Sequence, residues 1–191
     1  MDDPLDGSTT HLGAGIRLDH FELVEHLADG VHAAVYRAVD LCCGLQVAVK
    51  FPLRRTRAEP AVYRRWRREM ALLAMLDHPG ILRRWYTHER HDAYVVLELV
   101  SGGNLRSWIR AAPGGLPTRQ ATSWGIELAE ALAYLHSEGV VHSDIRPENI
   151  FVTDDLTLKL GHFGLARVTG RGRRWRRIRR IPFGSDSRTG A

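Results

Sequence analysis

The chain of 191 residues contains only two cysteines, Cys42 and Cys43, and they are adjacent. Neighbouring cysteines are badly placed to form a disulfide with each other, and no second pair supplies the spacing of a zinc motif. A small secreted fold held together by disulfides or by structural metal ions is therefore excluded.

Long hydrophobic runs are also missing. A membrane-spanning helix needs about 18 apolar residues in succession, whereas the best apolar stretch, Tyr94 to Leu97, is interrupted by Glu98. The acidic start, Met1 to Pro4, lacks the basic and then apolar order of a signal peptide. The composition, 44% hydrophobic and 26% charged, is typical of one globular domain or of one domain split into two lobes. The sequence therefore predicts a cytoplasmic protein without a membrane span.

Lysine is scarce. Of the 27 basic residues only Lys50 and Lys159 are lysines, so a position that keeps lysine is informative. The formal net charge is +5, but residues 171–180 carry seven arginines and no acidic residue, so the rest of the chain sums to −2. The basic character belongs to this tail and not to the domain.

The first half of the chain predicts a β-rich unit. Short runs rich in Val, Leu and aromatic residues, bounded by Gly, Asp or Pro, predict strands at 21–27, 34–39, 46–51 and 94–99. One helix interrupts them and ends at residues 77–80. Its apolar stripe comprises Val62, Trp66, Met70 and Leu73, with Leu76 behind it.

The second half predicts a helix followed by a polar loop and short strands. Thr118 is expected to cap the helix, and Gly139 is expected to end it. Its apolar stripe comprises Ala121, Trp124, Leu128, Leu132 and Leu135. The loop covers 142–149, and the strands are expected at 150–153 and 157–160. Residues 1–19 predict a flexible lead-in, and residues 168–191 an Arg-rich disordered tail.

Four motifs follow one another in a recognisable order. They are Val47-Ala48-Val49-Lys50, Glu69 on the first helix, His142-Ser143-Asp144-Ile145-Arg146-Pro147-Glu148-Asn149, and Gly161-His162-Phe163-Gly164. In this order they resemble the signature of the Ser/Thr-type protein kinases. The resemblance covers residues 20 to about 167 and implies an α+β, two-lobe kinase fold. Residues 20–100 would form a complete small lobe with the hinge, and residues 101–167 the first part of an incomplete helical lobe.

The resemblance assigns the catalytic and phosphate-binding roles. Lys50 would hold the α- and β-phosphates of ATP, and Glu69 would anchor Lys50 through an ion pair. Asp144 would accept the proton of the substrate hydroxyl, Arg146 would stabilise charge where these kinases usually carry Lys, and Asn149 would bind the metal ion. Phosphoryl transfer depends mainly on such positioning and charge neutralisation.

The resemblance also outlines the adenine pocket. Leu97 would lie at its back, and Ala48 and Phe151 would enclose the ring from above and below. The backbone of Glu98 and Val100 would bond the purine edge. Leu27, Gly30 and Val35 are expected to complete the nucleotide site.

Three departures from the family pattern predict impaired activity. The glycine-rich loop keeps only Gly30 of three glycines, and a Cβ at the other two positions hinders close approach of backbone N–H groups to phosphate. His162 replaces the Asp that would bind Mg²⁺, a cation that prefers oxygen ligands. Ser143 replaces an Arg that in many kinases binds a phosphorylated activation loop, so regulation by that route is not expected.

The leading hypothesis is an ATP-binding domain of the Ser/Thr kinase type, with phosphate transfer to protein hydroxyls impaired or absent, that acts on a protein substrate or partner. No counterpart of the later kinase helices is visible before Ala191, which leaves the 121–135 stripe partly exposed. One alternative is an active kinase completed by a partner chain. The other is a polyanion-binding module built on the tail, where Trp175 could stack; specific nucleic-acid recognition is not expected.

Overall fold

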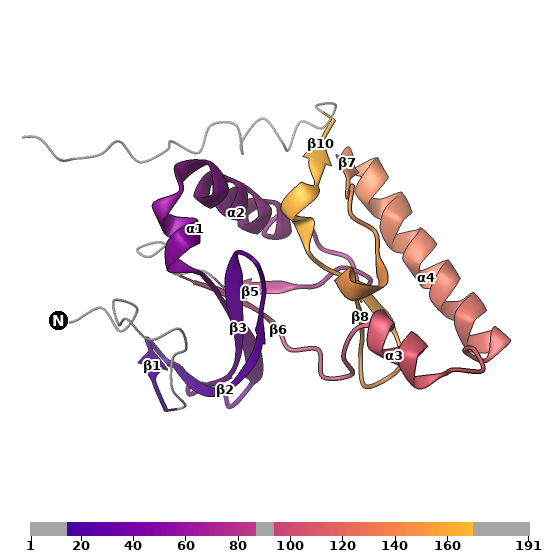
Figure 1. Ribbon diagram of the computed structural model, residues 1–191, viewed down its shortest axis with the longest axis horizontal. Helices are drawn as coiled ribbons and strands as arrows, with labels where there is room; N and C mark the ends of the chain where they lie inside the picture. The colour runs from indigo at the N-terminus through magenta and orange to yellow at the C-terminus, as the bar shows by residue number, and fades with distance from the viewer. Residues whose placement is uncertain (1–14, 87–93, 170–191) are drawn as a thin grey trace, which may run out of the picture.

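The computed structural model describes residues 15–86 and 94–169. The first lobe is built on one six-stranded antiparallel sheet with the order β1-β2-β3-β4-β6-β5 (Figure 1). The strands are β1 (Arg17–Leu18), β2 (Phe21–Asp29), β3 (Ala33–Asp40), β4 (Gln46–Pro52), β5 (Arg84–Tyr86) and β6 (Val95–Glu98). All four strands that were predicted for the first half of the chain are present, and β1 and β5 were not predicted.

The sheet separates two hydrophobic clusters, because successive side chains of a strand point to opposite faces. Val47, Val49 and Phe51 of β4 lie in one cluster, together with aromatic residues such as Tyr36. Ala48 lies in the other, which also holds the residues of the second lobe. Lys50 lies two positions after Ala48 on the same strand, so its side chain points to the same face of the sheet, toward the second lobe.

One helix packs on that face of the sheet, and a shorter helix precedes it in the chain. The short helix α1 (Arg54–Ala58) was not predicted, and α2 (Pro60–Leu73) follows it (Figure 1). Pro60 at the first turn of α2 has the φ angle that a helix start requires. Trp66, Met70 and Leu73 are buried, as the stripe predicted.

The second lobe contains α3 (Leu105–Ala111) and α4 (Thr118–Ser137) with short strands beside them. Helix α3 was not predicted; Asn104 caps it by accepting a hydrogen bond from the Ser107 N–H at 3.0 Å. The predicted cap of α4 at Thr118 is wrong. The carbonyl of Pro117 accepts the first helical bond from Ala121, so Pro117 is the N-cap and Thr118 is already helical. Gly139 ends the helix with φ +73°, as expected.

The remaining strands form two small ladders. Strand β7 (Val140–Val141) pairs with β10 (Arg167–Val168), and β8 (Ile150–Val152) pairs with β9 (Leu158–Leu160). Two short 3₁₀ turns, Pro147–Asn149 and Phe163–Leu165, lie within the motif loops.

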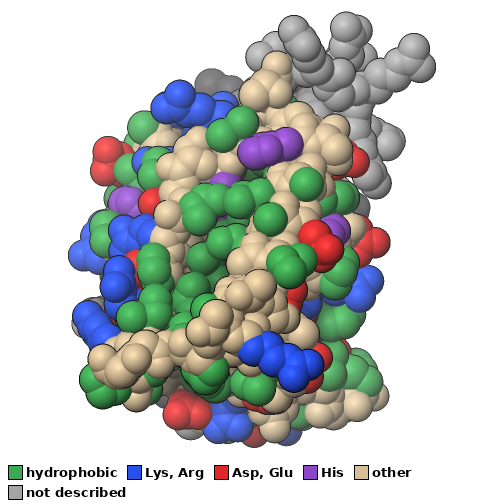
Figure 2. Space-filling model, turned by 90° about the vertical axis from the view of Figure 1, so that its right-hand side faces the viewer, with side chains coloured by type: hydrophobic (Ala, Val, Ile, Leu, Met, Phe, Trp, Pro, Cys, Tyr) green, Lys and Arg blue, Asp and Glu red, His purple; other side chains and the backbone are tan. Residues whose placement is uncertain are grey.

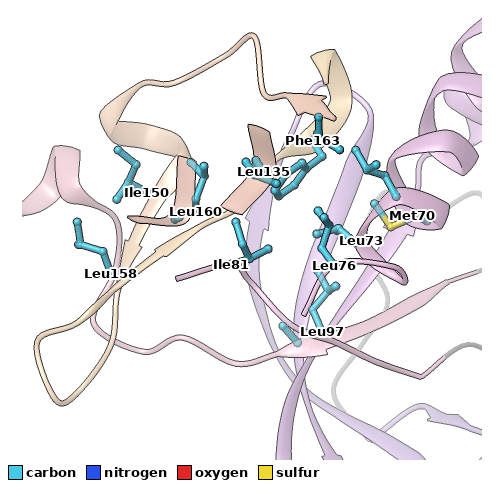
Figure 3. Close-up of a cluster of buried hydrophobic side chains, with 14 of the residues drawn as sticks. Met70, Leu73, Leu76, Ile81, Leu97, Leu135, Ile150, Leu158, Leu160 and Phe163 are labelled. Carbon is cyan, nitrogen blue, oxygen red and sulfur yellow. The ribbon is translucent and has the colours of Figure 1, made fainter. Parts of the chain in front are cut away.

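One core connects the lobes. Met70 and Leu73 of α2 belong to the same buried cluster as Leu135 of α4, and Leu160 and Phe163 lie in it too (Figure 3). The turn Phe163–Leu165, which follows His162, is thereby packed directly against α2.

The apolar stripe of α4 is only partly buried, as expected. Trp124 and Leu135 are buried, whereas Leu128 and Leu132 are half-buried and Ala121 is exposed. Figure 2 shows the side of the molecule on which α4 lies, with a band of hydrophobic side chains across it.

The two ends of the described chain are attached to the domain. The sheet begins at Arg17, within the expected lead-in, and Thr169 donates its N–H to the Gly139 carbonyl at 2.8 Å, within the expected tail. Residues 1–14 and 170–191, and with them the Arg cluster, lie outside the described residues. Among the helices that the structure describes, none is both long enough and apolar enough to cross a bilayer.

Replacing Gly102 by Ala is expected to destabilise the junction between the lobes. A Cβ on Gly102 would lie 2.4 Å from the Val152 carbonyl oxygen of β8, where only backbone movement could relieve the clash. The Trp108 indole N–H also donates to the Gly102 carbonyl at 2.7 Å, which restricts such movement. We expect a loss of about 1–3 kcal/mol in unfolding free energy, measured by urea denaturation. The control Gly125→Ala, in open space on α4, should gain up to about 1 kcal/mol. Equal values for the two variants would contradict the close approach.

Candidate functional site

The centre of the candidate site is a buried ion pair. Lys50 Nζ of β4 lies 3.0 Å from Glu69 Oε1 of α2, and only 10% and 8% of the two side chains are exposed. Lys50 reaches Glu69 because it points to the α2 face of the sheet, and Glu69 lies on the buried face of α2 between Trp66 and Met70. The predicted pairing is present.

His142 organises the polar loop from inside the core. Its Nε2 lies 2.9 Å from the Gly161 carbonyl oxygen, and its Nδ1 accepts a hydrogen bond from the Asp144 N–H at 3.3 Å. This arrangement requires the neutral tautomer protonated at Nε2. Burial lowers the pKa of His142, consistent with a neutral ring. The Phe163 ring packs edge-on against it.

Asn149 holds the catalytic-type loop in shape. Its Nδ2 donates to both the carbonyl oxygen and the Oδ2 atom of Asp144, each at 2.8 Å. The Asn149 carbonyl in turn accepts the Gly161 N–H at 2.9 Å. A carboxamide nitrogen only donates hydrogen bonds, so the carboxamide oxygen of Asn149 is the atom suited to bind a cation.

His162 lies next to the ion pair in a left-handed backbone conformation, with φ 67° and ψ 65°. Its Nδ1 is 3.9 Å from Glu69 Oε1, and 57% of its side chain is exposed. Partial burial of the ring lowers the pKa of His162, and the positive charge of Lys50 lowers it further. The imidazole is therefore neutral at neutral pH.

The side chains of His162, Asn149 and Asp144 do not form a set of ligands that suits Mg²⁺. This ion requires oxygen ligands in near-octahedral geometry, and a neutral imidazole is a poor substitute. With nitrogen at His162, the oxygen atoms of Asn149 and Asp144 are the remaining donors of the matched motifs. The residues present do not make a normal magnesium site.

The turn that carries His162 is packed tightly against α2. A Cβ on Gly164 would lie 3.3 Å from Glu69 Oε2, and Arg65 of α2 donates a hydrogen bond to the Gly164 carbonyl. Phe163 is buried in the core that joins the lobes (Figure 3). The turn that carries His162 is therefore in direct contact with Glu69 of the ion pair.

Arg146 is engaged by a neighbour. Its Nε donates to Glu148 Oε2 at 3.2 Å, and Arg106 of α3 donates to Glu148 Oε1 at 2.9 Å. The hydrogen bond from Arg106, reinforced by the charge of Arg146, holds the pKa of Glu148 below its usual range. The guanidinium of Arg146 is thus oriented by Glu148, a contact that sequence reasoning did not anticipate.

The turn between β2 and β3 is anchored to α1. The Thr56 hydroxyl and the Leu53 N–H both donate to the His32 carbonyl, at 2.8 and 3.0 Å. Arg55 Nε donates to the Val31 carbonyl at 3.1 Å. Sequence reasoning missed this anchor because α1 has no apolar periodicity. The buried Thr56 in an otherwise Arg-rich segment was the available signal.

The other predicted nucleotide-binding residues differ in how far they are buried. Ala48 lies opposite Leu97 in the β4–β6 ladder, and both are buried. Val35 and Phe151 are half-buried, whereas Leu27 and Gly30 are exposed on the β2–β3 hairpin. Val100 is half-buried after β6.

The second lysine of the chain connects the hinge to β9. Lys159 Nζ lies 3.0 Å from Glu98 Oε2 and donates to the Pro79 carbonyl at 3.1 Å. Glu98 Oε1 accepts the Arg83 N–H at 2.7 Å. The Glu98 side chain is thus held by Lys159 and Arg83, and sequence reasoning assigned no role to Lys159.

The structure has a two-lobe α+β fold. A strand lysine, Lys50, pairs with a helix glutamate, Glu69, and faces the loops that carry Asp144 and His162. Together these features define a protein kinase domain. The family model described as the protein kinase domain matches residues 21–180, and the chain belongs to this family. The predicted family and fold are confirmed. Members of this family bind a nucleotide and a protein substrate, and generally use ATP and Mg²⁺.

The relatives that the chain resembles are Ser/Thr kinases. It is 35% identical over 154 residues to serine/threonine-protein kinase cds1 of Schizosaccharomyces pombe, a match covering 78% of this chain and 33% of that protein. A probable serine/threonine-protein kinase of Streptomyces coelicolor is 36% identical over 155 residues, covering 78% and 23%. Serine/threonine-protein kinase PknB of Mycobacterium leprae is 32% identical over 155 residues, covering 78% and 25%. The chain spans a third or less of the length of these relatives.

Proposed function

We propose that this chain is an ATP-binding domain of the Ser/Thr kinase type in which phosphate transfer to protein hydroxyls is weak or absent. The observation that carries the proposal is the buried Lys50–Glu69 pair with His162 beside it. The pair is the phosphate-binding arrangement of a kinase, and His162 removes the acidic metal ligand that the reaction requires.

Several contacts support nucleotide binding. Lys50 is held by Glu69, so its ammonium is positioned before any phosphate arrives and less entropy is lost on binding. Ala48, Leu97 and Phe151 would line the purine ring with apolar side chains, and the backbone of Glu98 and Val100 would bond its edge. Leu27, Gly30 and Val35 would cover the nucleotide from the β2–β3 hairpin.

The contacts around the catalytic loop support weak transfer. Asp144 would accept a hydroxyl proton, and the Asn149 amide nitrogen holds it by donating to its carbonyl oxygen and to its Oδ2 atom. Arg146 is directed to Glu148. With a neutral imidazole at His162, charge on the transferred phosphoryl group would be poorly neutralised, and neutralisation is the main source of catalysis in this reaction. The domain would then act mainly by binding a protein partner.

Thermal unfolding with ATP, in Mg²⁺ or in EDTA, tests this proposal. A ligand that binds only the folded state stabilises it by about 2.7 kcal/mol at a hundredfold excess over Kd. We expect ATP to raise the unfolding midpoint equally in Mg²⁺ and in EDTA, and we expect Lys50→Met to abolish the rise.

The other outcomes overturn parts of the proposal. A rise only in Mg²⁺, together with phosphate transfer that is lost in Asp144→Asn, would identify an active kinase. A cooperative transition that ATP does not move would refute nucleotide binding.

A further inference from the structure

A histidine, an aspartate and a cysteine meet at the end of the sheet opposite the β2–β3 turn. His20 immediately precedes β2, Asp40 ends β3, and Cys42 lies in the turn that leads to β4. Phe21 pairs with Asp40 in the β2–β3 ladder, which places His20 beside Asp40 although 20 residues separate them in sequence. One ligand atom from each of His20, Asp40 and Cys42 lies within 4.8 Å of the other two.

Backbone hydrogen bonds hold this turn in shape. The Gly44 N–H donates to the Asp40 carbonyl at 2.7 Å, with Gly44 at φ +73°, and the Asp40 N–H donates to the Leu45 carbonyl at 2.9 Å. The Leu41 N–H donates to the His20 carbonyl at 2.8 Å, which ties the turn to the segment before β2. The backbone of all three cluster residues is therefore fixed in advance.

The Asp40 carboxylate is shared between the turn and the histidine. Its Oδ1 accepts the Cys42 N–H at 2.8 Å, while its Oδ2 lies 3.8 Å from His20 Nε2. The outer oxygen atom is thus directed toward the same space as the imidazole.

The cysteines of the chain are concentrated at this turn. Cys42 and Cys43 are the only two in 191 residues, and both are exposed. A thiolate, an imidazole and a carboxylate together form a donor set suited to zinc and to similar thiophilic divalent ions, and unsuited to Mg²⁺ or Ca²⁺.

We propose that His20, Asp40 and Cys42 form a binding site for one zinc-class divalent ion, with water in the fourth position. In a tetrahedral zinc site the metal–ligand bonds of 2.0–2.3 Å place ligand atoms roughly 3.3–3.8 Å apart. Because the three ligand atoms lie within 4.8 Å of one another, the cluster must contract by at most about 1–1.5 Å, which rotation of the exposed Cys42 side chain can supply. Binding releases the Cys42 thiol proton and leaves a thiolate–metal bond. Cys43 is not a ligand in this proposal.

Titration of the purified full-length chain with Cd²⁺ and Zn²⁺ under a non-thiol reductant tests the site. Cd²⁺ bound to a thiolate gives an ultraviolet charge-transfer band, and calorimetry gives the Zn²⁺ stoichiometry. We expect one ion per chain and a raised thermal midpoint. Cys42→Ser, His20→Ala and Asp40→Asn should each weaken Zn²⁺ binding at least tenfold, whereas the matched control Cys43→Ser should stay within threefold of the wild type.

The variants separate this site from adventitious thiol binding. If His20→Ala and Asp40→Asn both bind Zn²⁺ as tightly as the wild type, the thiols bind alone and the proposal fails. It also fails if Cys43→Ser loses as much affinity as Cys42→Ser, or if no ion binds. Unfolding of each metal-free variant is measured in parallel, and His20→Ala, at a position outside any strand, decides the case if Asp40→Asn disturbs the turn.

Discussion

Replacing His162 by Asp is expected to make ATP binding depend on Mg²⁺. The substitution places a carboxylate beside Lys50 and Glu69, where the structure has a neutral imidazole. Together with the carboxamide oxygen of Asn149 it would complete the oxygen donors that Mg²⁺ prefers. Aspartate adopts the left-handed backbone conformation of residue 162 as readily as histidine, so we expect no backbone penalty.

The expected size is at least a tenfold tighter Kd for ATP in Mg²⁺, which is about 1.4 kcal/mol. In EDTA the same variant should bind ATP no better than the wild type, because an added negative charge opposes the phosphates. Calorimetry with and without Mg²⁺ measures both values. His162→Ala is the matched control, since it removes the ring without adding oxygen. If His162→Ala tightens ATP binding in Mg²⁺ as much as His162→Asp does, relief of crowding and not metal binding is responsible.

Removing Glu69 is expected to give the largest loss of stability. Glu69→Ala leaves the Lys50 ammonium buried without its partner, and breaking a buried ion pair in this way costs about 3–5 kcal/mol. Urea denaturation measures the change in unfolding free energy. Because Glu69 also positions the Lys50 ammonium for phosphate, the ATP-induced rise in midpoint should fall at the same time.

A double-mutant cycle isolates the pair. Lys50→Met with Glu69→Leu replaces both charges by apolar groups of similar size, which is often nearly neutral for a buried pair. The double variant should therefore be more stable than Glu69→Ala, although it should not respond to ATP. If the loss of unfolding free energy in the double variant equals the sum of the losses in Lys50→Met and Glu69→Leu, the 3.0 Å contact contributes no coupling energy.

Local patterns predicted the elements that have a clear period. The alternating residues of β4 and the apolar stripe of α2 were recognisable because each repeats within a few positions. Helix α3 was missed because it is short and none of its residues is buried. Helix α1 was missed because arginines fill most of its five positions. The cap at Thr118 was wrongly predicted because Pro117, one residue earlier, accepts the first helical bond.

In the candidate site, too, some features were predicted from the sequence and others were not. The order of Lys50, Glu69, the 142–149 loop and His162 was enough to identify the kinase family, and the Lys50–Glu69 pair was expected from that resemblance. The contacts of Arg146 with Glu148 and of Thr56 with His32 were not expected. They depend on side-chain direction or on an element without a sequence pattern.

The sequence by itself determined the family of this protein, the strands and helices that carry its motifs, and the histidine at position 162 where the resemblance implies an aspartate. Only the tertiary structure decided the other side-chain contacts. Antiparallel pairing brings His20 to Asp40, and packing of α3 on the 142–149 loop brings Arg106 to Glu148. Periodicity records which way a residue faces within its own element, whereas the distance between residues far apart in sequence is set by how the elements pack.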